Sequence, residues 1–460
     1  MSASPSNSDS SHLRVADQIR EAPRDLKGTL REIGPGIIIA GSVVGSGELI
    51  ATTIAGAEAG FWLLWIILTG CIVKVSVQLE VGRAAILSGK TSLALLADLP
   101  GWKPLGFHWI AWVVLAMLFG GIGQMGGVLG GVGQALALSV PLSETQSTSV
   151  LIWALIIAVG TAALLWPGKY QLMERVMIVI VGIFTLVSVI NVFALQGHAE
   201  WAISARELGQ GLSFQFPPGK EFTIGLTTAL AAFGIIGMAA GEIYFYPYWC
   251  LKKGYGRYTG PDDGSEAWRE RAEGWLRVMK WDAMCSMAVY TISTVAFYLL
   301  GASVLARAGL KPSGTELIEV LSQMYEPVFG SMGVGMFLAG ACVVLYSTFL
   351  VNNASSALVW ADVIKGRKSE DQKLRAEKVL GVALPLGAAL MFVVMPNPRA
   401  WVIFAGITQT LTLPLLGYAA IKFRFRPSIR LFRHGIAGDV FLVFTVLVLI
   451  AAAATLLFVI

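Results

Sequence analysis

Eleven apolar segments, each long enough to cross a lipid bilayer, follow one another along the chain. A hydrocarbon core about 30 Å thick needs about 20 apolar residues in a helix. Because lipid offers the backbone no hydrogen bonds, such segments fold as α-helices. The segments are 33–55, 60–85, 105–138, 149–166, 173–195, 222–249, 283–305, 328–361, 379–396, 400–421 and 437–460. We therefore expect an all-α polytopic membrane protein, with the lipid bilayer as its first partner.

The composition excludes several classes of protein. Hydrophobic residues make up 55% of the chain and charged residues only 14%, too few to cover the surface of a soluble protein of 460 residues. The four cysteines are scattered, with no CxxC or Cys/His cluster, so we expect neither disulfides nor a zinc site. There is no nucleotide-binding loop or nucleophile motif, so we expect no enzyme and no cofactor. No secretory signal peptide is expected either.

Positive residues are divided unevenly between the two sides of the expected bundle. Of the 34 Lys and Arg residues, 28 fall in the tail and alternate connections, five fall in the other connections, and Lys74 lies within a span. Cytoplasmic connections of membrane proteins carry the excess of Lys and Arg. We therefore expect a cell-membrane protein with its N-terminus in the cytoplasm and its C-terminus outside. The same distribution accounts for the net charge of +5 without a nucleic-acid partner.

Two glutamates lie deep in glycine-rich apolar segments of similar sequence. Glu48 occurs in VVGSGELIAT of the first segment, and Glu242 occurs in GMAAGEIYFYP of the sixth. A carboxylate inside a membrane span is costly and by default marks a functional site. The glycines before each glutamate weaken the helix, and helix breaks in corresponding positions of two halves indicate the binding site of a transporter.

The offset of five spans between the two motifs implies two halves of opposite orientation, because an odd offset inverts the topology. We expect a cytoplasmic N-terminal tail over 1–32 and a single transmembrane domain over 33–460. Within that domain the first repeat covers 33–195, the second, inverted repeat covers 222–421, and an extra span covers 437–460.

Several blocks of the chain resemble the Nramp family of divalent metal transporters. The block IGPGIIIAGSVVGSGELIATTIAGAEAGFWLLWIIL (33–68) is similar to the first two spans of that family. Weaker similarities are EVGRAAILSGKTSLAL, GQMGGVLGGVGQALAL, FGIIGMAAGEIYFY and TQTLTLPLL, so the resemblance covers most of 33–421. It implies the LeuT-type fold, with two inverted five-helix repeats plus an eleventh span and with helices one and six broken. It also implies transport by alternating access.

The chain departs from the family at the positions that carry its chemistry. With the GPG motifs superimposed, the metal-binding Asp, the Pro and the Asn of the family fall on Gly45, Ser46 and Glu48. The Met-Pro-His of the sixth span falls near Ala240, Gly241 and Glu242, so no sulfur ligand stands at the position of the family's Met.

The proton route of the family also lacks its residues. The span-three acids fall on Gln124 and Gly127, and the paired arginines of span nine have no counterpart in VLGVALPLGAALMFVV. If the chain carries a divalent cation, we expect transport without the usual proton route.

Two midplane carboxylates without a sulfur ligand favour a hard cation, because oxygen ligands suit Mg²⁺ and Mn²⁺. Span ten contributes to the metal site in the family, which adds two polar residues to the expected site. The expected substrate-binding residues are Gly45, Ser46, Gly47, Glu48, Ala240, Gly241, Glu242, Gln409 and Thr412. Residues expected to line the cavity or to couple transport are Lys74, Gln124, Tyr244, Asn352 and Asn353.

Lys74 leaves three interpretations open. Its ammonium could pair with Glu80, reach Glu48 or Glu242, or extend to the membrane surface. A lysine paired with a site glutamate would lower the affinity for cations and favour a substrate other than a metal.

The sequence supports three hypotheses. The first is a secondary transporter of divalent cations, with Mg²⁺ or Mn²⁺ favoured. The second is a carrier of the same fold for a small organic solute or inorganic anion, coupled or not to a cation. The third is a sensor built on a carrier scaffold, which the lack of a sizeable soluble domain disfavours. A monomer is expected, although the sequence leaves the oligomeric state open.

Overall fold

The computed structural model describes residues 19–104, 109–167, 171–216, 222–365, 370–426, 432 and 435–460. Within this part of the chain, eleven helical segments are long and apolar enough to cross a membrane, which confirms the expected number of spans. Most of the N-terminal tail, residues 1–18, lies outside the described residues, as do Lys169 and Lys220 of the charge count.

The first five spans run through the following elements. Span one is α3 (Pro35–Val43), η1 (Val44–Thr52) and α4 (Thr53–Ala59); spans two to five are α5 (Leu64–Ser88), α7 (Trp109–Ser139), α8 (Gln146–Leu165) and α9 (Gln171–Ala194). Short helices precede or connect them: α2 (Leu26–Glu32), α6 (Ser92–Ala97), η3 (Leu195–Gly197) and α10 (Ala205–Gly211).

The remaining six spans begin with the interrupted sixth. Span six is α11 (Phe222–Ile235) and α12 (Ala240–Lys253); span seven is α14 (Glu266–Leu300) with η4 (Gly301–Leu305); spans eight to eleven are α16 (Glu326–Lys365), α17 (Glu370–Val394), α18 (Pro398–Arg424) and α19 (Gly435–Val459). The connecting helices are α13 (Tyr255–Thr259), η5 (Gly314–Glu316), α15 (Leu317–Ser322) and η6 (Gln323–Tyr325).

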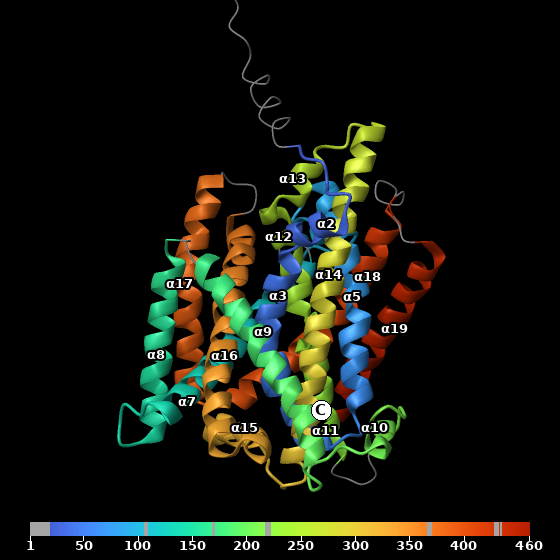
Figure 1. Cartoon of the computed structure of the whole chain (residues 1–460). Helices are drawn as coiled ribbons and strands as arrows, with labels where there is room; N and C mark the ends of the chain where they lie inside the picture. Colours follow the sequence, from blue (N-terminus) through green and yellow to red (C-terminus); the bar gives the residue numbers. More distant parts are fainter. Residues whose placement is uncertain are drawn as a thin grey trace, which may run out of the picture.

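Spans one and six form the centre of the bundle. In each of these two spans, 89% of the residues in the most apolar stretch are buried, whereas the corresponding share is 33% in spans five and nine. Figure 1 shows α8 and α17 along one edge of the molecule and α19 along the other, with α3 between them. Span one begins beside α2 and α13, whereas α11 begins near α10 at the opposite end, so the two central spans run in opposite directions (Figure 1). This is the arrangement that inverted repeats require.

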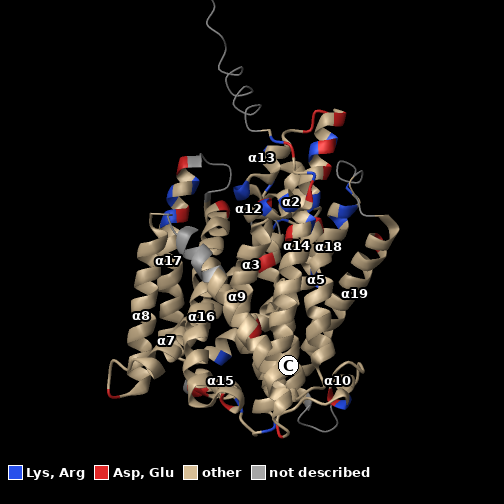
Figure 2. Ribbon diagram, in the orientation of Figure 1, with Lys and Arg blue, Asp and Glu red and all other residues tan. Residues whose placement is uncertain are grey.

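Charged residues concentrate at one end of the bundle. Figure 2 shows most Lys and Arg at the end that carries α2, α13 and the extended start of α14, and few near α10 and α15. A buried ion-pair cluster lies among α5, α18 and α19, where Glu80 pairs with Arg83 and Arg424 and Arg424 also pairs with Asp439. The membrane orientation that this charge distribution implies stays a prediction.

Candidate functional site

The break in span six places Glu242 inside the protein. Residues 236–239 are not helical, and Gly237 has φ of +54°, a conformation that glycine adopts at least cost. A Cβ at this position would lie 2.9 Å from the Tyr290 ring. Glu242 then falls in the first turn of α12 with only 4% of its surface exposed. A helix N-terminus favours a negative charge there, which offsets part of the cost of burial.

The irregular part of span one takes a different form from the one expected. Val44–Thr52 is a continuous π-helix rather than unwound chain. The glycines serve close packing: a Cβ on Gly45 would lie 2.4 Å from Thr348 Oγ1, and one on Gly47 would lie 2.5 Å from the Ile235 carbonyl. Gly45 N also donates to Thr348 Oγ1 at 3.1 Å. Gly45 and Gly47 therefore let spans eight and six approach.

Two side chains from other spans donate to the Glu242 carboxylate. Asn352 Nδ2 of α16 donates to Oε1 at 3.3 Å, and Ser42 Oγ of α3 donates to the same oxygen at 3.4 Å. Asn352 was among the expected cavity residues, whereas Ser42 was missed. Its spacing of four residues from Ser46 puts both on one face of a helix, a signal that could have found it.

A chain of amide hydrogen bonds joins four spans beside Glu242. Gln124 Nε2 of α7 donates to Ser46 Oγ at 2.9 Å, and Gln409 Nε2 of α18 donates to Gln124 Oε1 at 2.8 Å. Gly241 N then donates to Gln409 Oε1 at 3.0 Å. The structure thus brings together Ser46, Gly241, Gln409 and Gln124, which sequence reasoning had assigned to the site or to its cavity.

A small cavity of about 10 Å³ lies at this cluster. That volume corresponds to about one water molecule. The lining residues come from α7, α12, α16 and α18: Met117, Leu118, Gly121, Gln124, Gly241, Glu242, Phe245, Asn352, Ser356 and Gln409. Glu242 is the charged member of this set. Met117 of span three adds a thioether, which the comparison of span six with the Nramp family did not predict.

Glu48 lies away from the cavity that Glu242 lines. It is fully buried, and its Oε1 accepts a hydrogen bond from Thr294 Oγ1 of α14 at 3.1 Å. Its Oε2 has no hydrogen-bond partner among the described residues. Glu48 is not among the described lining residues of the Glu242 cavity. Thr294 was missed by sequence reasoning, because a threonine in an apolar span carries no distinguishing signal.

Lys74 contacts neither glutamate. Its ammonium donates to the carbonyl oxygens of Phe233 at 2.6 Å and Ile236 at 2.5 Å. In the part of the chain that the structure describes, no ion pair joins Lys74 to an acidic side chain. The proposed pairing with Glu80 is wrong, because the arginines of the buried cluster occupy that carboxylate. Extension to the membrane surface is also wrong, because Lys74 is fully buried.

Four other expected residues lie outside the cavity lining. Asn353 Nδ2 and Thr412 Oγ1 each donate to the carbonyl four residues earlier in their own helices. Ala240 has no polar side chain and starts α12. The buried hydroxyl of Tyr244 has no hydrogen-bond partner among the described residues, and its ring contacts Tyr248.

Polar contacts close the protein on both sides of the site. At the α2 end, Asp282 of span seven accepts from Gly34 N at 2.7 Å, Gly36 N at 2.6 Å and Tyr246 Oη at 2.9 Å. These bonds join the start of α3 and the side chain of Tyr246 in α12 to the middle of α14. At the other end, Glu58 after the π-helix pairs with Arg399 of α18 and accepts from Thr228 of α11 at 2.5 Å.

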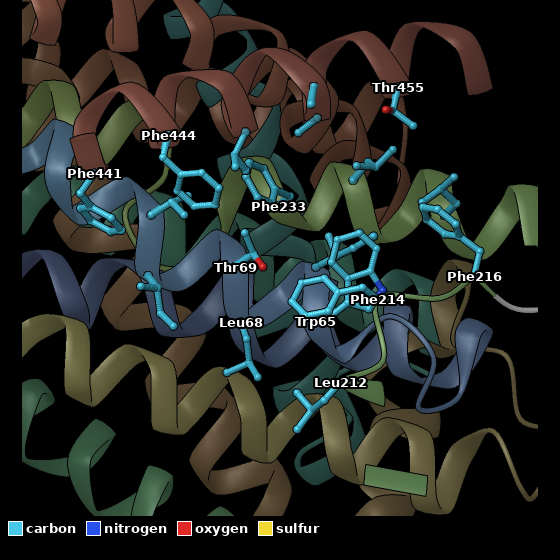
Figure 3. Close-up of a pocket in the computed structure, with 18 residues that line it drawn as sticks. Trp65, Leu68, Thr69, Leu212, Phe214, Phe216, Phe233, Phe441, Phe444 and Thr455 are labelled. Atoms are coloured by element: carbon cyan, nitrogen blue, oxygen red, sulfur yellow. The ribbon is translucent and has the colours of Figure 1, made fainter. Parts of the chain in front are cut away.

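A separate apolar groove of about 500 Å³ lies between α5, α11 and α19. Figure 3 shows Trp65, Phe214, Phe233 and Phe444 directed toward it. Its lining is almost entirely apolar, so it offers no polar group for an ion. Volume therefore does not identify the functional site, and the small polar cavity does.

The donor set constrains what the site can hold. The described residues contain no group of three or more His, Cys, Asp or Glu side chains that could hold a metal ion together. One carboxylate, amide oxygens and a thioether are available instead, and the remaining ligands of a hard cation would be water.

Comparisons with known proteins place the chain among metal transporters. The model of the natural resistance-associated macrophage protein-like family matches residues 36–459. A divalent metal cation transporter MntH of Caldanaerobacter subterraneus is 23% identical over 324 residues, 69% of either chain. The NRAMP-like transporter smf-2 of Caenorhabditis elegans is 25% identical over 210 residues, 45% of this chain and 35% of its own length.

Solved structures agree on the fold. A manganese transporter of Eremococcus coleocola superimposes with a TM-score of 0.64 at 14% identity, over 95% of this chain and 89% of its own. The nucleobase-cation-symport transporter Mhp1 superimposes with a TM-score of 0.52 at 16% identity, over 95% and 93%. These likenesses show the LeuT-type fold that the sequence implied. Because the family model extends over almost the whole chain, this protein belongs to the natural resistance-associated macrophage protein-like (Nramp) family of multi-pass membrane transporters.

Proposed function

We propose that this chain is a secondary transporter that moves a divalent cation, Mg²⁺ or Mn²⁺, across the cell membrane by alternating access. The observation that carries the proposal is Glu242, which is buried at the break of span six and lines a small cavity of about 10 Å³. A lone carboxylate that faces amide groups in a membrane span is an electrostatic site for a cation.

The contacts of Glu242 leave room for a ligand. The hydrogen bonds that Ser42 and Asn352 donate to this carboxylate both end on Oε1, and Glu242 lines the cavity. Asn352 Oδ1 and the two glutamine carbonyls supply further oxygens nearby. Mg²⁺ needs only one or two carboxylates and keeps several waters, and Mn²⁺ also accepts oxygen ligands.

Met117 bears on the choice between these ions. A thioether is a softer ligand than a carboxylate or an amide and helps to select transition metals over Mg²⁺. Met117→Leu keeps the volume of the side chain and removes the sulfur. If Met117 contributes to selection, this variant carries Mg²⁺ better relative to Mn²⁺ than the wild type does.

We also propose that transport does not use the usual proton route of the family. Gln124, at one position of that route, is held in the amide chain. At the other position a Cβ on Gly127 would lie 2.7 Å from the Pro398 carbonyl, so a carboxylate side chain would not fit without movement of α18. Metal uptake without matching acidification of the vesicle lumen is the expected result.

The second candidate is a carrier of the same fold for a small organic solute or inorganic anion. The observation that favours it is that the cavity has one carboxylate and lacks the Asp and His ligands of the family. Two features oppose it: an anion would meet the Glu242 charge, and an organic solute would exceed a cavity of about 10 Å³.

Uptake into proteoliposomes tests the proposal. The panel contains Mn²⁺, Mg²⁺ and Ca²⁺, then organic solutes and inorganic anions, each with and without a pH gradient. If uptake of Mn²⁺ or Mg²⁺ is saturable and is lost in Glu242→Gln, the proposal of divalent-cation transport is supported. Saturable uptake of an organic solute or anion, with no binding of divalent cations at millimolar concentration, replaces it with the second candidate.

The placement in the membrane is part of the proposal. We place the N-terminus and the tail of 1–32 in the cytoplasm and the C-terminus outside, on the uneven distribution of Lys and Arg. We treat 33–460 as one transport domain.

A further inference from the structure

Lys74 is a fully buried cation in the middle of span two whose hydrogen bonds go to backbone carbonyls. Its Nζ also lies 5.2 Å from the centre of the Phe233 ring. A buried ammonium normally pairs with a carboxylate, because burial of an unpaired charge is costly. Among the described residues, no acidic side chain forms an ion pair with Lys74, and its ammonium donates to two backbone carbonyls instead.

The surroundings of Lys74 fix the direction of its side chain. Its neighbours Ile72 and Val73 line the apolar groove of Figure 3, between α5, α11 and α19. Phe233 lines the same groove, and the Lys74 ammonium lies 5.2 Å from the centre of its ring. Lys74 therefore points inward, to the end of α11.

The two carbonyls are those that the break in span six leaves without helical partners. Helix α11 ends at Ile235, so the last carbonyls of this helix have no donor one turn later. The negative end of the helix dipole lies at the same place and attracts a cation. In transporters with broken spans, the C-terminal ends of half-helices coordinate the coupling cation.

We propose that Lys74 is a positioning residue whose ammonium acts as a built-in monovalent cation at the end of α11. It satisfies the Phe233 and Ile236 carbonyls and thereby holds the geometry of the break. Ile236 is followed by Gly237 at φ of +54° and, five residues further, by Glu242. The position of the Glu242 carboxylate thus depends on Lys74 without any contact between them. This inference does not depend on which substrate the protein carries.

The inference predicts that removal of the side chain creates a site for an external cation. Lys74→Ala deletes three carbons and the ammonium, and it leaves two carbonyl oxygens beside an empty volume. Propylammonium has the same atoms as the deleted part. 1-Propanol has nearly the same shape without the charge and serves as the neutral control.

Thermal unfolding of purified protein in detergent measures this effect independently of transport. Lys74→Ala is expected to have a lower Tm than the wild type, and propylammonium is expected to raise that Tm saturably. The wild type, with the site filled, should show no such shift, nor should Lys90→Ala, which removes an exposed lysine that pairs with Asp98. 1-Propanol should not stabilise Lys74→Ala.

Uptake provides the second measurement. Loss of two hydrogen bonds from a charged donor is expected to reduce uptake of the transported ion by Lys74→Ala on the order of tenfold or more. Propylammonium should restore much of that loss. Lys74→Met fills the space without a charge, so it should be impaired and insensitive to propylammonium. This variant also serves if Lys74→Ala does not fold.

Two results would overturn the inference. One is wild-type Tm and wild-type uptake in Lys74→Met, because the charge would then be dispensable. The other is a folded Lys74→Ala whose Tm responds to propylammonium no more than that of Lys90→Ala. If no substrate is transported by any variant, the Tm response still decides the role of Lys74, while the proposed function fails separately.

Discussion

Replacement of Glu242 by Gln is the sharpest test of the site, because Gln keeps the shape of the side chain and removes its charge. Glu242 lines the small polar cavity, whereas Glu48 is not among its described lining residues. If a divalent cation binds in this cavity, Glu242→Gln should weaken binding far more than Glu48→Gln. Sequence reasoning alone assigned both glutamates to the substrate-binding site.

The magnitude follows from burial. Two unit charges 4 Å apart interact by about 4 kcal/mol at an effective dielectric constant of about 20, so a divalent cation and a carboxylate interact by about 8 kcal/mol as an upper bound. Dehydration of both groups offsets part of this energy, and the amide oxygen remains as a ligand. Loss of one partner of a buried charge pair costs about 2 to 5 kcal/mol. We therefore expect Glu242→Gln to weaken binding about 30-fold or more.

Glu48→Gln should weaken binding by less than about tenfold, or 1.4 kcal/mol, since Glu48 acts on the cavity only through its long-range charge. Isothermal titration of Mn²⁺ and Mg²⁺ into each variant measures both effects. Glu144→Gln, an exposed loop residue, is the matched control and should bind as the wild type does. Equal losses in the two site variants, or wild-type binding in Glu242→Gln, would refute the assignment of the cation to this cavity.

Three further predictions concern the break, the closing contacts and a loop. Gly237→Ala should destabilise the fold by at least about 1 to 2 kcal/mol, because φ is +54° and the Tyr290 ring is in the way, and Tm should fall together with uptake. Asp282→Asn should open the α2 end, because it weakens three hydrogen bonds to a charged acceptor. The labelling of buried Cys250 by a maleimide, with Cys285 and Cys342 changed to Ser, should then be faster than in the same background with Asp282 intact. Partial burial alone would raise the pKa of Glu207, but hydrogen bonds from Ser204 and Arg307 lower this pKa overall. The ionised Glu207 therefore stabilises the folded protein. This stabilisation is complete above the unfolded-state pKa of about 4.3 and is lost as pH falls through the lower folded-state pKa. Emission of Trp201 from pH 6 to 3 should report that change, and its absence in the wild type or its persistence in Glu207→Gln would contradict the assignment.

The separation of Glu48 from Glu242 shows where sequence reasoning stops. Both glutamates follow glycines in apolar segments, and hydropathy treats them alike. Packing separates them: Glu48 faces Thr294 of α14, and Glu242 faces Asn352 of α16. The direction of a side chain from a π-helix, as opposed to the first turn of an α-helix, does not follow from residue spacing.

The amide chain shows a second limit: the sequence identified its residues but not the contact between them. Gln124 and Gln409 were each identified as polar residues within a span, and Gln409 was ranked high because of the family resemblance. Their mutual hydrogen bond at 2.8 Å joins residues 285 positions apart. Such a contact depends on how α7 and α18 pack, and no local pattern encodes it.

The sequence by itself determined the class of the protein, the number of spans and the position of the break in span six. These follow from the cost of exposing backbone and charge to lipid, which acts on each segment separately and is therefore readable from composition. The tertiary structure decided which polar groups meet: Glu242 with the two glutamines, Glu48 with Thr294, and Lys74 with the end of α11. Those pairings depend on the rotation and crossing of helices from distant parts of the chain. Packing of small and large side chains sets that geometry, and hydropathy does not.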